Sequence, residues 1–525
     1  MDEALEVTTV EEIEKSEQAA PKKPEKTFDA VDVVFAFAAL FCGFLYWNLI
    51  RIYAPGAGVT VFAVIMIALS FIYLSKSKIK QNSVSIVCLL LTIASAAQFA
   101  IFDNRIIGAL NFVFLSAVFV YWICVSTGRR IDEKLSVYII GDAIKQVFSM
   151  PFRNFGCCVS GISKGFSKYT KIKGVLPAIA GVMLFLPLLI FVTELLISAD
   201  LAFENFVKNI FDYMDVYKII IYVVQFTLGI PVAFYLYGLI YGNVKGRYAE
   251  KITVESVDKA AKIVKFAPKT AIYTVLAAFN AIYCLFFAVQ AAYLFSAFNG
   301  NLPEVFTYAE YARRGFFELC MVAGINLGIL IISHLTVKKE LGEEPKLLRA
   351  GTLGTSLFTI LLIATALSKM VMYINAYGLT QLRVFTSWFM VLLLFIFAVI
   401  CIRQFKKFNA SKFIVVGFVV MFMALSYGNV DGLIAKYNIS RYEAGTLPTF
   451  DVEMIAGLSD AAVPHIYDLY LRTDESDFNM RWQLESSIID GKVYGTSGFR
   501  EFNFQRYRAD EIREIMNDSV YLPGR

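Results

Sequence analysis

Hydrophobic and polar positions along this chain form long apolar segments separated by polar loops. A helix needs about 20 mostly apolar residues to cross roughly 30 Å of hydrocarbon, and eleven segments meet or approach that length. They span residues 31–50, 55–74, 83–102, 106–125, 175–198, 219–243, 271–295, 316–335, 348–374, 384–402 and 413–427. Short strands of alternating polarity are missing from the pattern, which argues against a β-barrel. We expect an all-α integral membrane protein with about eleven transmembrane helices.

The two ends of the chain differ from this pattern. The first thirty residues are acidic and lysine-rich, contain Pro21 and Pro24, and have neither an apolar run nor a small-residue cleavage site. This composition predicts a disordered tail and not a signal peptide. Long apolar runs stop after residue 427, and residues 461–471 and 508–517 have the pattern of short helices. We therefore divide the chain into a cytoplasmic tail (1–30), a membrane domain (31–427) and a small extracytoplasmic C-terminal cap (428–525).

Charge in the loops predicts the orientation. Lysine and arginine concentrate in alternate loops, within residues 76–80, 129–173, 245–269, 338–349 and 403–412. Basic loops stay in the cytoplasm, so eleven spans place the N-terminus inside and the C-terminus outside. One span more or fewer would reverse the side of the C-terminal residues. The net charge of +5 follows from this topology and does not indicate a nucleic-acid partner.

The amino-acid composition gives little evidence for a particular chemical activity. Hydrophobic residues make up 58% of the chain, above the 45–50% usual in soluble domains. The eight cysteines all precede residue 402, so no disulfide framework holds the C-terminal cap. The adjacent Cys157 and Cys158 are best explained as small packing residues.

One long loop, three prolines and a pair of glycines lead to further predictions about the structure. Residues 127–174 mix apolar and basic side chains, as in an interfacial helix leading to Pro151 on an anionic leaflet, although a plain connector fits equally well. Pro177, Pro187 and Pro231 fall within spans and predict kinked helices, which occur in transporters and in other membrane proteins alike. Gly238 and Gly242 would let another helix approach closely.

Several charged residues lie in or beside the spans. On a helix, Glu310, Arg314 and Glu318 form one i, i+4, i+8 ladder that enters the eighth span. A charge inside a span costs about 2.5–3.5 kcal/mol on insertion scales, so we predict that Lys369 pairs with Glu318 or Glu194. The candidate binding or structural cluster on the outer face comprises Glu194, Glu310, Arg313, Arg314, Glu318, Lys369 and Arg383.

Four motifs share the outer face in this topology. They are residues 307–318, 373–383, 431–442 and 500–508, all rich in Arg, Tyr, Asn or Glu. Side chains of these types form dense hydrogen-bond networks. Positive-inside topology alone does not require them there, so they are the strongest functional signal in the sequence.

Five sequence motifs along the chain resemble those of a known protein family. The motifs are YAEYARRGFFEL, YGLTQLRV, IAKYNISRY, LSDAAVP and EFNFQRY. The family is a bacterial family of multi-pass membrane proteins known only as a domain of unknown function. The resemblance covers roughly the last two-thirds of the chain and implies location in the bacterial plasma (inner) membrane. It implies no activity, substrate or catalytic residue.

Common catalytic motifs are missing. The chain has two histidines, at 334 and 465, and no HExxH or CxxC motif, so a zinc enzyme is disfavoured. It also lacks the GxxxxGK[ST] and GxGxxG phosphate loops and the GxSxG nucleophile elbow. We expect no metal and no cofactor.

Three functions remain open. The first is a non-enzymatic envelope sensor or scaffold, whose partners are the lipid bilayer and an envelope protein or lipid headgroup. The second is a secondary transporter with Glu194, Glu318 and Lys369 along its path. The third is an outer-leaflet enzyme that modifies lipids or glycans, with Arg313, Arg314 and Arg383 holding a phosphate headgroup. We favour the first, because no base–nucleophile pair is visible.

Overall fold

The protein is helical in every part that the structure describes. The computed structural model describes residues 28–51, 53–132, 135–136, 138–167, 175–203, 216–248, 267–298, 316–337, 346–447, 450–489 and 498–521. Within these ranges the only β pairing is an isolated bridge between Ala267 and Val337. The predicted all-α class is confirmed for these residues.

Ten of the described helices are long and apolar enough to cross a membrane. They are α2 (Ala30–Leu49), α3 (Ala57–Lys76), α4 (Ser83–Ile101), α5 (Arg105–Ser126), α11 (Val216–Lys245), α13 (Lys269–Phe298), α15 (Phe316–Thr336), α16 (Lys346–Tyr377), α17 (Gln381–Phe405) and α18 (Ala410–Tyr427). The remaining predicted span is also a helix, α9 (Val175–Ala199) of 25 residues, but it is not among the ten. The structure thus supports a membrane protein, with one candidate span fewer than the sequence predicts.

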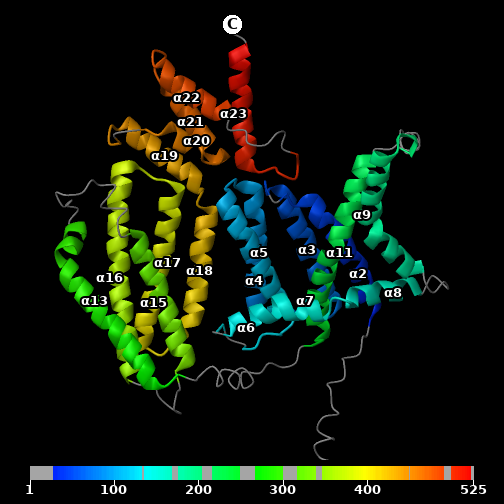
Figure 1. The fold of residues 1–525 in the computed structure, drawn as a ribbon, viewed down its shortest axis with the longest axis horizontal. Helices are drawn as coiled ribbons and strands as arrows, with labels where there is room; N and C mark the ends of the chain where they lie inside the picture. The colour runs from blue at the N-terminus through cyan, green and yellow to red at the C-terminus, as the bar shows by residue number, and fades with distance from the viewer. Residues whose placement is uncertain are drawn as a thin grey trace, which may run out of the picture.

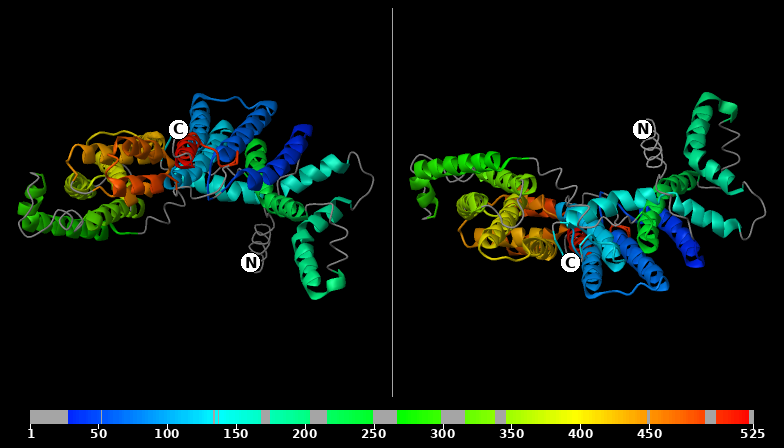
Figure 2. Two further views of the ribbon diagram at one scale, coloured as in Figure 1. Left: turned by 90° about the horizontal axis from the view of Figure 1, so that it is seen from above. Right: turned by 90° about the horizontal axis from the view of Figure 1, so that it is seen from below.

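The long helices form two bundles side by side (Figures 1 and 2). The first bundle contains α2, α3, α4, α5 and α11, and its largest core includes Tyr73, Trp122 and Tyr237. The second contains α13, α15, α16, α17 and α18, with a separate core that includes Phe316, Met390 and Phe397. Helix α9 stands beside α11, on the side of the first bundle that faces away from the second (Figure 1).

Close backbone contacts hold the first bundle together. A Cβ atom on Gly43 of α2 would lie 2.2 Å from the Gly229 carbonyl oxygen of α11, so both helices depend on glycine here. Gly238 and Gly242 similarly admit Pro151 and Asn154 from the loop after α5. The predicted close approach at this glycine pair is therefore made by a short lateral segment, not by another long helix.

A buried aspartate fixes the N-terminal end of this bundle. Asp32 of α2 is 1% exposed. It accepts a hydrogen bond from the Tyr73 hydroxyl at 2.7 Å and pairs with Lys245 at 2.9 Å. The same lysine reaches Asp29 at 2.7 Å. Helices α2, α3 and α11 are thereby joined at one end, and sequence reasoning did not single out Asp32.

Short helices cross the same end of the molecule (Figure 1). Helix α6 (Ile139–Ile144) continues through a π-helical turn (Lys145–Ser149) into α7 (Met150–Arg153), and α8 (Cys157–Ser167) follows. Large apolar side chains are exposed at every fourth position, namely Ile140, Ile144, Phe148 and Phe152, whereas Asp142 and Gln146 are buried. An exposed apolar stripe beside basic residues fits a helix lying in the membrane interface.

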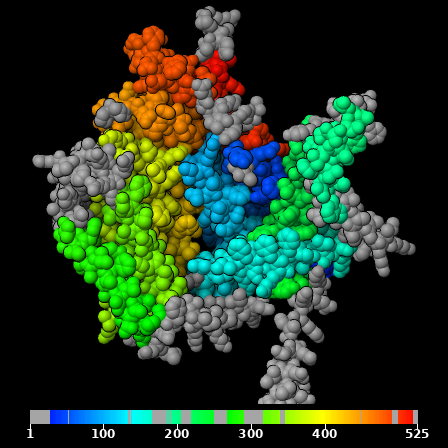
Figure 3. Space-filling model, viewed as in Figure 1, coloured from blue at the N-terminus to red at the C-terminus, as the bar shows by residue number. Residues whose placement is uncertain are grey.

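The C-terminal helices cover the opposite end. They are α19 (Val430–Glu443), α20 (Val452–Ala456), a 3₁₀ turn (Asp460–Ala462), α21 (Val463–Arg472), α22 (Phe478–Ile489) and α23 (Phe504–Tyr521). Figure 3 shows them, in orange and red, seated on the ends of both bundles. They share an apolar core that includes Ile439, Ile466, Leu484 and Ile512. The sequence predicted α21 and part of α23, whereas α19, α20 and α22 were missed.

The first bundle also contains an apolar cavity of about 480 Å³. The cavity is partly open to the surroundings of the bundle, because its lining residues Ser116, Phe152 and Pro231 are exposed.

Candidate functional site

Three of the four predicted polar motifs meet where the C-terminal helices touch the two bundles. Their central residue is Asp431, at the start of α19, which is 1% exposed. Its carboxylate accepts hydrogen bonds from the Asn104 amide at 2.9 Å, the Gln381 amide at 2.8 Å and the backbone N–H of Ser459 at 3.2 Å. We call this arrangement, together with the ion pairs described next, the polar junction.

Asp431 joins parts of the chain that are far apart in sequence. Asn104 caps α5 in the first bundle, and Gln381 begins α17 in the second. Ser459 precedes the 3₁₀ turn in the C-terminal helices. A buried carboxylate is stable only when its lone pairs are satisfied, and here each bundle and the C-terminal helices supply one donor.

An alternating chain of acids and arginines extends the junction. Arg506 of α23 pairs with Asp103 in the α4–α5 loop and lies 3.5 Å from Asp460. Asp460 also pairs with Arg513, which reaches Asp510 at 2.9 Å. The Ser459 side chain makes no capping hydrogen bond to the 3₁₀ turn that follows it. The Asp460 carboxylate binds the two arginines.

The backbone of the fourth motif completes the contact with the first bundle. The N–H groups of Ala57 and Gly58, at the start of α3, donate to the carbonyls of Phe502 at 2.7 Å and Arg500 at 3.0 Å. Helix N-termini leave N–H groups without intrahelical partners, and these carbonyls satisfy two of them. Gly58 has no room for a Cβ atom, which would lie 2.1 Å from the Leu49 carbonyl oxygen.

The second motif forms the turn between α16 and α17, where it contacts α19. Gly378 has a φ of +75°, a conformation that glycine adopts without strain in a tight turn. Arg383 stacks over the Tyr373 ring, 4.0 Å from its centroid, and donates to the carbonyls of Tyr377 and Gly378. Asn438 of α19 accepts from the Leu379 N–H at 2.7 Å and donates to the Leu379 carbonyl at 2.8 Å. Arg383 thus stabilises a helix end through its Nη1 group.

The remaining predicted site residues are Glu194, Glu310, Arg313, Arg314, Glu318 and Lys369. Glu310, Arg313 and Arg314 lie outside the described residues. Lys369 of α16 is half-buried and lies within electrostatic range of Glu318 on α15. Glu194 is exposed on α9, at the opposite side of the molecule (Figures 1 and 2). The structure therefore does not group Glu194 with Lys369, and pairing with Glu318 stays a prediction.

A buried polar row inside the second bundle was missed. The Asn326 amide donates to Thr359 at 2.8 Å and its carbonyl accepts from the Tyr283 hydroxyl, while Asn280 donates to Thr355 at 3.0 Å. The signal was present in the sequence, since α16 carries hydroxyl residues at 352, 355, 356 and 359, an i, i+3, i+4, i+7 face. Such contacts hold membrane helices together, each by about 1 kcal/mol.

Burial changes the acidity of the junction. It raises the pKa of Asp103 to about 6, and the neighbouring Asp460 carboxylate adds to this, although Arg506 acts in the opposite direction. Asp103 lies in the loop between α4 and α5, outside the spanning segments. The junction therefore takes up a proton in a mildly acidic range in which ordinary aspartates stay ionised.

We expect Asp431→Ala to destabilise the protein by roughly 3–5 kcal/mol, because two buried amides and one N–H lose their acceptor. Asp431→Asn retains one acceptor oxygen and should cost less. Thermal unfolding in detergent measures both, with the exposed Asp451→Asn as control for loss of a carboxylate. Equal melting temperatures for Asp431→Ala and the wild type would show that the junction contributes nothing.

We also expect the stability contribution of Asp103 to depend on pH. Its folded pKa of about 6 exceeds the ordinary 3.8, so the contribution is full below pH 3.8 and is lost as pH rises through 6. A shift of this size is worth at most about 3 kcal/mol. Melting curves of the wild type and Asp103→Asn, compared between pH 4.5 and 7.5 with Asp451→Asn as control, test this. Parallel curves for the wild type and Asp103→Asn would contradict it.

Comparison with known proteins gives a family but no activity. Residues 84–469 match a family described as Domain of unknown function (DUF4153). The matched region runs from α4 into α21 and contains the junction residues Asn104, Gln381, Asp431 and Asp460, whereas Arg506 and the fourth motif lie beyond it. No curated protein and no solved structure matches the chain. Since the match spans well over half of the 525 residues, the chain belongs to this family of domains of unknown function.

Proposed function

We propose that this protein is a non-enzymatic sensor or scaffold of a bacterial plasma membrane, in which extracytoplasmic C-terminal helices hold two transmembrane bundles together. The single observation that carries the proposal is the polar junction. Asp431 binds donors from both bundles and from the C-terminal helices. An apolar cluster that includes Ile107, Leu425 and Ile434 joins the same three parts, so their relative position depends on this meeting point. A change in the position of the C-terminal helices would therefore alter the contacts of both bundles.

The state of the junction side chains supports this function over catalysis. Arg383, Arg506 and Arg513 are each engaged with protein carbonyls or carboxylates. A phosphate-binding site for lipid chemistry would need such groups to face an open cleft. The pocket at Asp431 is lined instead by Gln98, Asn104 and Gln505 and has room for about one water molecule, with a volume near 10 Å³.

The surface of the C-terminal helices also suits a scaffold. Phe478 and Trp482 lie one turn apart on α22 and are 80% and 67% exposed. Large exposed aromatic residues are typical of a surface that binds another protein. An envelope protein is the partner that this position favours.

The path of the chain supports the proposal of eleven crossings and an outside C-terminus. Helix α11 runs antiparallel to α2, because Gln225 bonds Asn48 at one end and Lys245 pairs with Asp29 at the other. Helix α8 lies at the Asp29 end, where Lys164 donates to the Phe28 carbonyl. The chain must therefore change ends between α8 and α11, and α9, with 25 residues, is long enough to do so.

Basic residues support the same orientation. The end that carries Asp29 also carries the loops with Lys80, Arg129, Arg247 and Lys407. Positive loops tend to remain in the cytoplasm, which supports an extracytoplasmic position for the junction and the C-terminal helices. The exposed apolar stripe of α6 and α7 would lie in the cytoplasmic leaflet.

The orientation predicts which cysteines react from outside. A membrane-impermeant maleimide should label Glu475→Cys, in the loop between α21 and α22, in intact cells. It should label Lys407→Cys, between α17 and α18, only after the cells are permeabilised. Both native side chains are exposed, so accessibility is matched. Labelling of Lys407→Cys in intact cells would overturn the orientation.

A non-enzymatic role predicts an unchanged chemical profile. Three strains are compared: a deletion strain, the same strain carrying the wild-type gene, and the same strain carrying Asp431→Ala. We expect the same lipid and metabolite species in all three. Cells and medium are analysed separately, because a transporter moves a species between them without changing its total. A species that accumulates in the deletion strain and disappears with the wild-type gene would refute the proposal.

A further inference from the structure

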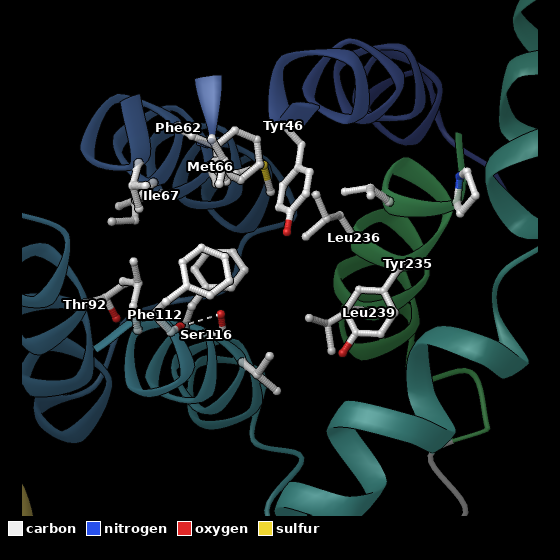
Figure 4. Close-up of a pocket in the computed structure, with 18 of the residues that line it drawn as sticks. Tyr46, Phe62, Met66, Ile67, Thr92, Phe112, Ser116, Tyr235, Leu236 and Leu239 are labelled. Carbon is white, nitrogen blue, oxygen red and sulfur yellow. Dashed lines mark hydrogen bonds between the residues drawn. The ribbon is translucent and has the colours of Figure 1, made fainter. Parts of the chain in front are cut away.

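The cavity of the first bundle has a hydrocarbon lining. Its walls come from α2, α3, α4, α5, α7 and α11, and they include Phe62, Met66, Phe112, Leu236 and Leu239 (Figure 4). At about 480 Å³, its volume falls within the range of roughly 300–1,000 Å³ seen for ligand sites. Lys369 and the residues of the polar junction do not contribute to this lining.

Water is a poor occupant of this space. The hydroxyls of Thr92 and Ser116 donate to the carbonyls of Cys88 and Phe112 in their own helices, both at 2.8 Å. The Tyr235 hydroxyl donates to the Val147 carbonyl at 3.0 Å. A buried water needs two to four polar partners, and apolar cavities without them stay dry. Inside a bilayer the surrounding solvent is hydrocarbon, so a hydrocarbon chain is the natural occupant.

The cavity is elongated along the helices. Ile50 and Val59 line it at the junction end of α2 and α3, and Phe152 and Phe155 line it near α7, at the opposite end of the bundle. Pro231 of α11 also faces it. Proline inside a helix removes one backbone hydrogen bond and bends the helix, which makes room between α11 and its neighbours. A chain lying parallel to the bilayer normal fits this shape.

One polar group in the lining indicates which end of a bound hydrocarbon chain would lie at this end of α2. Tyr46 lies one turn before the end of α2, and its hydroxyl points into the open space (Figure 4). A phenolic hydroxyl at this level is a hydrogen-bond donor for a carbonyl oxygen. Ester carbonyls stand at the boundary between lipid headgroups and hydrocarbon, where the end of a spanning helix also lies.

We propose that the cavity binds one acyl chain of a glycerolipid, with its ester carbonyl at Tyr46 and its methyl end toward Phe152 and Phe155. The lipid completes the core of the first bundle from the outer leaflet. This site is independent of the proposed sensor or scaffold role, because it lies in a different part of the molecule from the polar junction.

Photo-crosslinking of the full-length protein in nanodiscs tests the proposal. The probe is a phosphatidylethanolamine with a diazirine in one acyl chain, and adducts are mapped by peptide mass spectrometry. In the wild type we expect adducts at Met66 and Phe112 inside the cavity, and at Val113, which is 67% exposed on the outer face of the bundle. Adducts at Val113 alone would overturn the proposal.

Two matched substitutions separate filling of the cavity from misfolding. Leu236→Trp fills the cavity, and each displaced methylene is worth about a factor of four in binding, so adducts at Met66 and Phe112 should fall at least tenfold. Leu228→Trp places the same side chain on the exposed outer face of the same helix and should change nothing. Unchanged labelling of Val113 shows that each variant is folded. Equal labelling of Met66 in Leu236→Trp and Leu228→Trp would refute the site.

The position of the ester is tested separately. Tyr46→Phe keeps the ring and removes the donor, so adducts inside the cavity should fall about fivefold, the worth of one hydrogen bond. An excess of unlabelled isoprenyl phosphate, which has no ester carbonyl, should not compete with the probe. Full competition by isoprenyl phosphate, or no effect of Tyr46→Phe, would show that the occupant is not an ester-linked chain.

Discussion

The buried carboxylate of Asp431 is the interaction on which the arrangement of the molecule depends. The two bundles have separate apolar cores, and the C-terminal helices have a third. In lipid there is little hydrophobic force to press one bundle against another, because acyl chains solvate apolar helices as well as other helices do. A buried charge is different, since it is stable only while all of its donors remain in place. Asp431 therefore fixes the three parts together with the apolar cluster of Ile107, Leu425, Val430 and Ile434, which joins the same parts.

The ends and the middle of the protein are stabilised by different means. One end of the first bundle is stabilised by Asp32, which binds Tyr73 and Lys245. The other end is stabilised by Asp431 and by the ion pairs that link Asp103, Arg506, Asp460 and Arg513. Between these ends, the helices approach through glycine pairs in the first bundle and through hydroxyl and amide contacts in the second. Charges at the ends remain close to water or headgroups, where burying them costs less than at the bilayer centre.

The cavity in the first bundle fits this division. Close contact of α2 and α11 at Gly43 and Gly229 brings their backbones together, and the proline at 231 lies half a turn further along α11. Where the helices separate, no side chain from the second bundle fills the gap. A membrane protein can leave such a gap without penalty if a lipid chain occupies it, which a soluble protein cannot do.

The sequence by itself determined the helical class, the positions of the long helices and the residue types that gather beyond their ends. These are local properties, because a span of about 20 apolar residues is recognisable without knowing its neighbours.

Only the tertiary structure decided which polar groups meet. Arg383 was proposed as a phosphate ligand, and in the structure its Nη1 group donates to carbonyls of its own turn. Asp460 pairs with two arginines, and α9, which carries Glu194, lies on the opposite side of the molecule from α16 (Figure 1). The buried Asp32 and the hydroxyl row of α16 were overlooked, although the spacing of the latter is visible in the sequence. Pairing depends on which helices become neighbours and at what depth, and in this chain the partners of Asp431 lie up to 327 residues away. No local pattern carries that information.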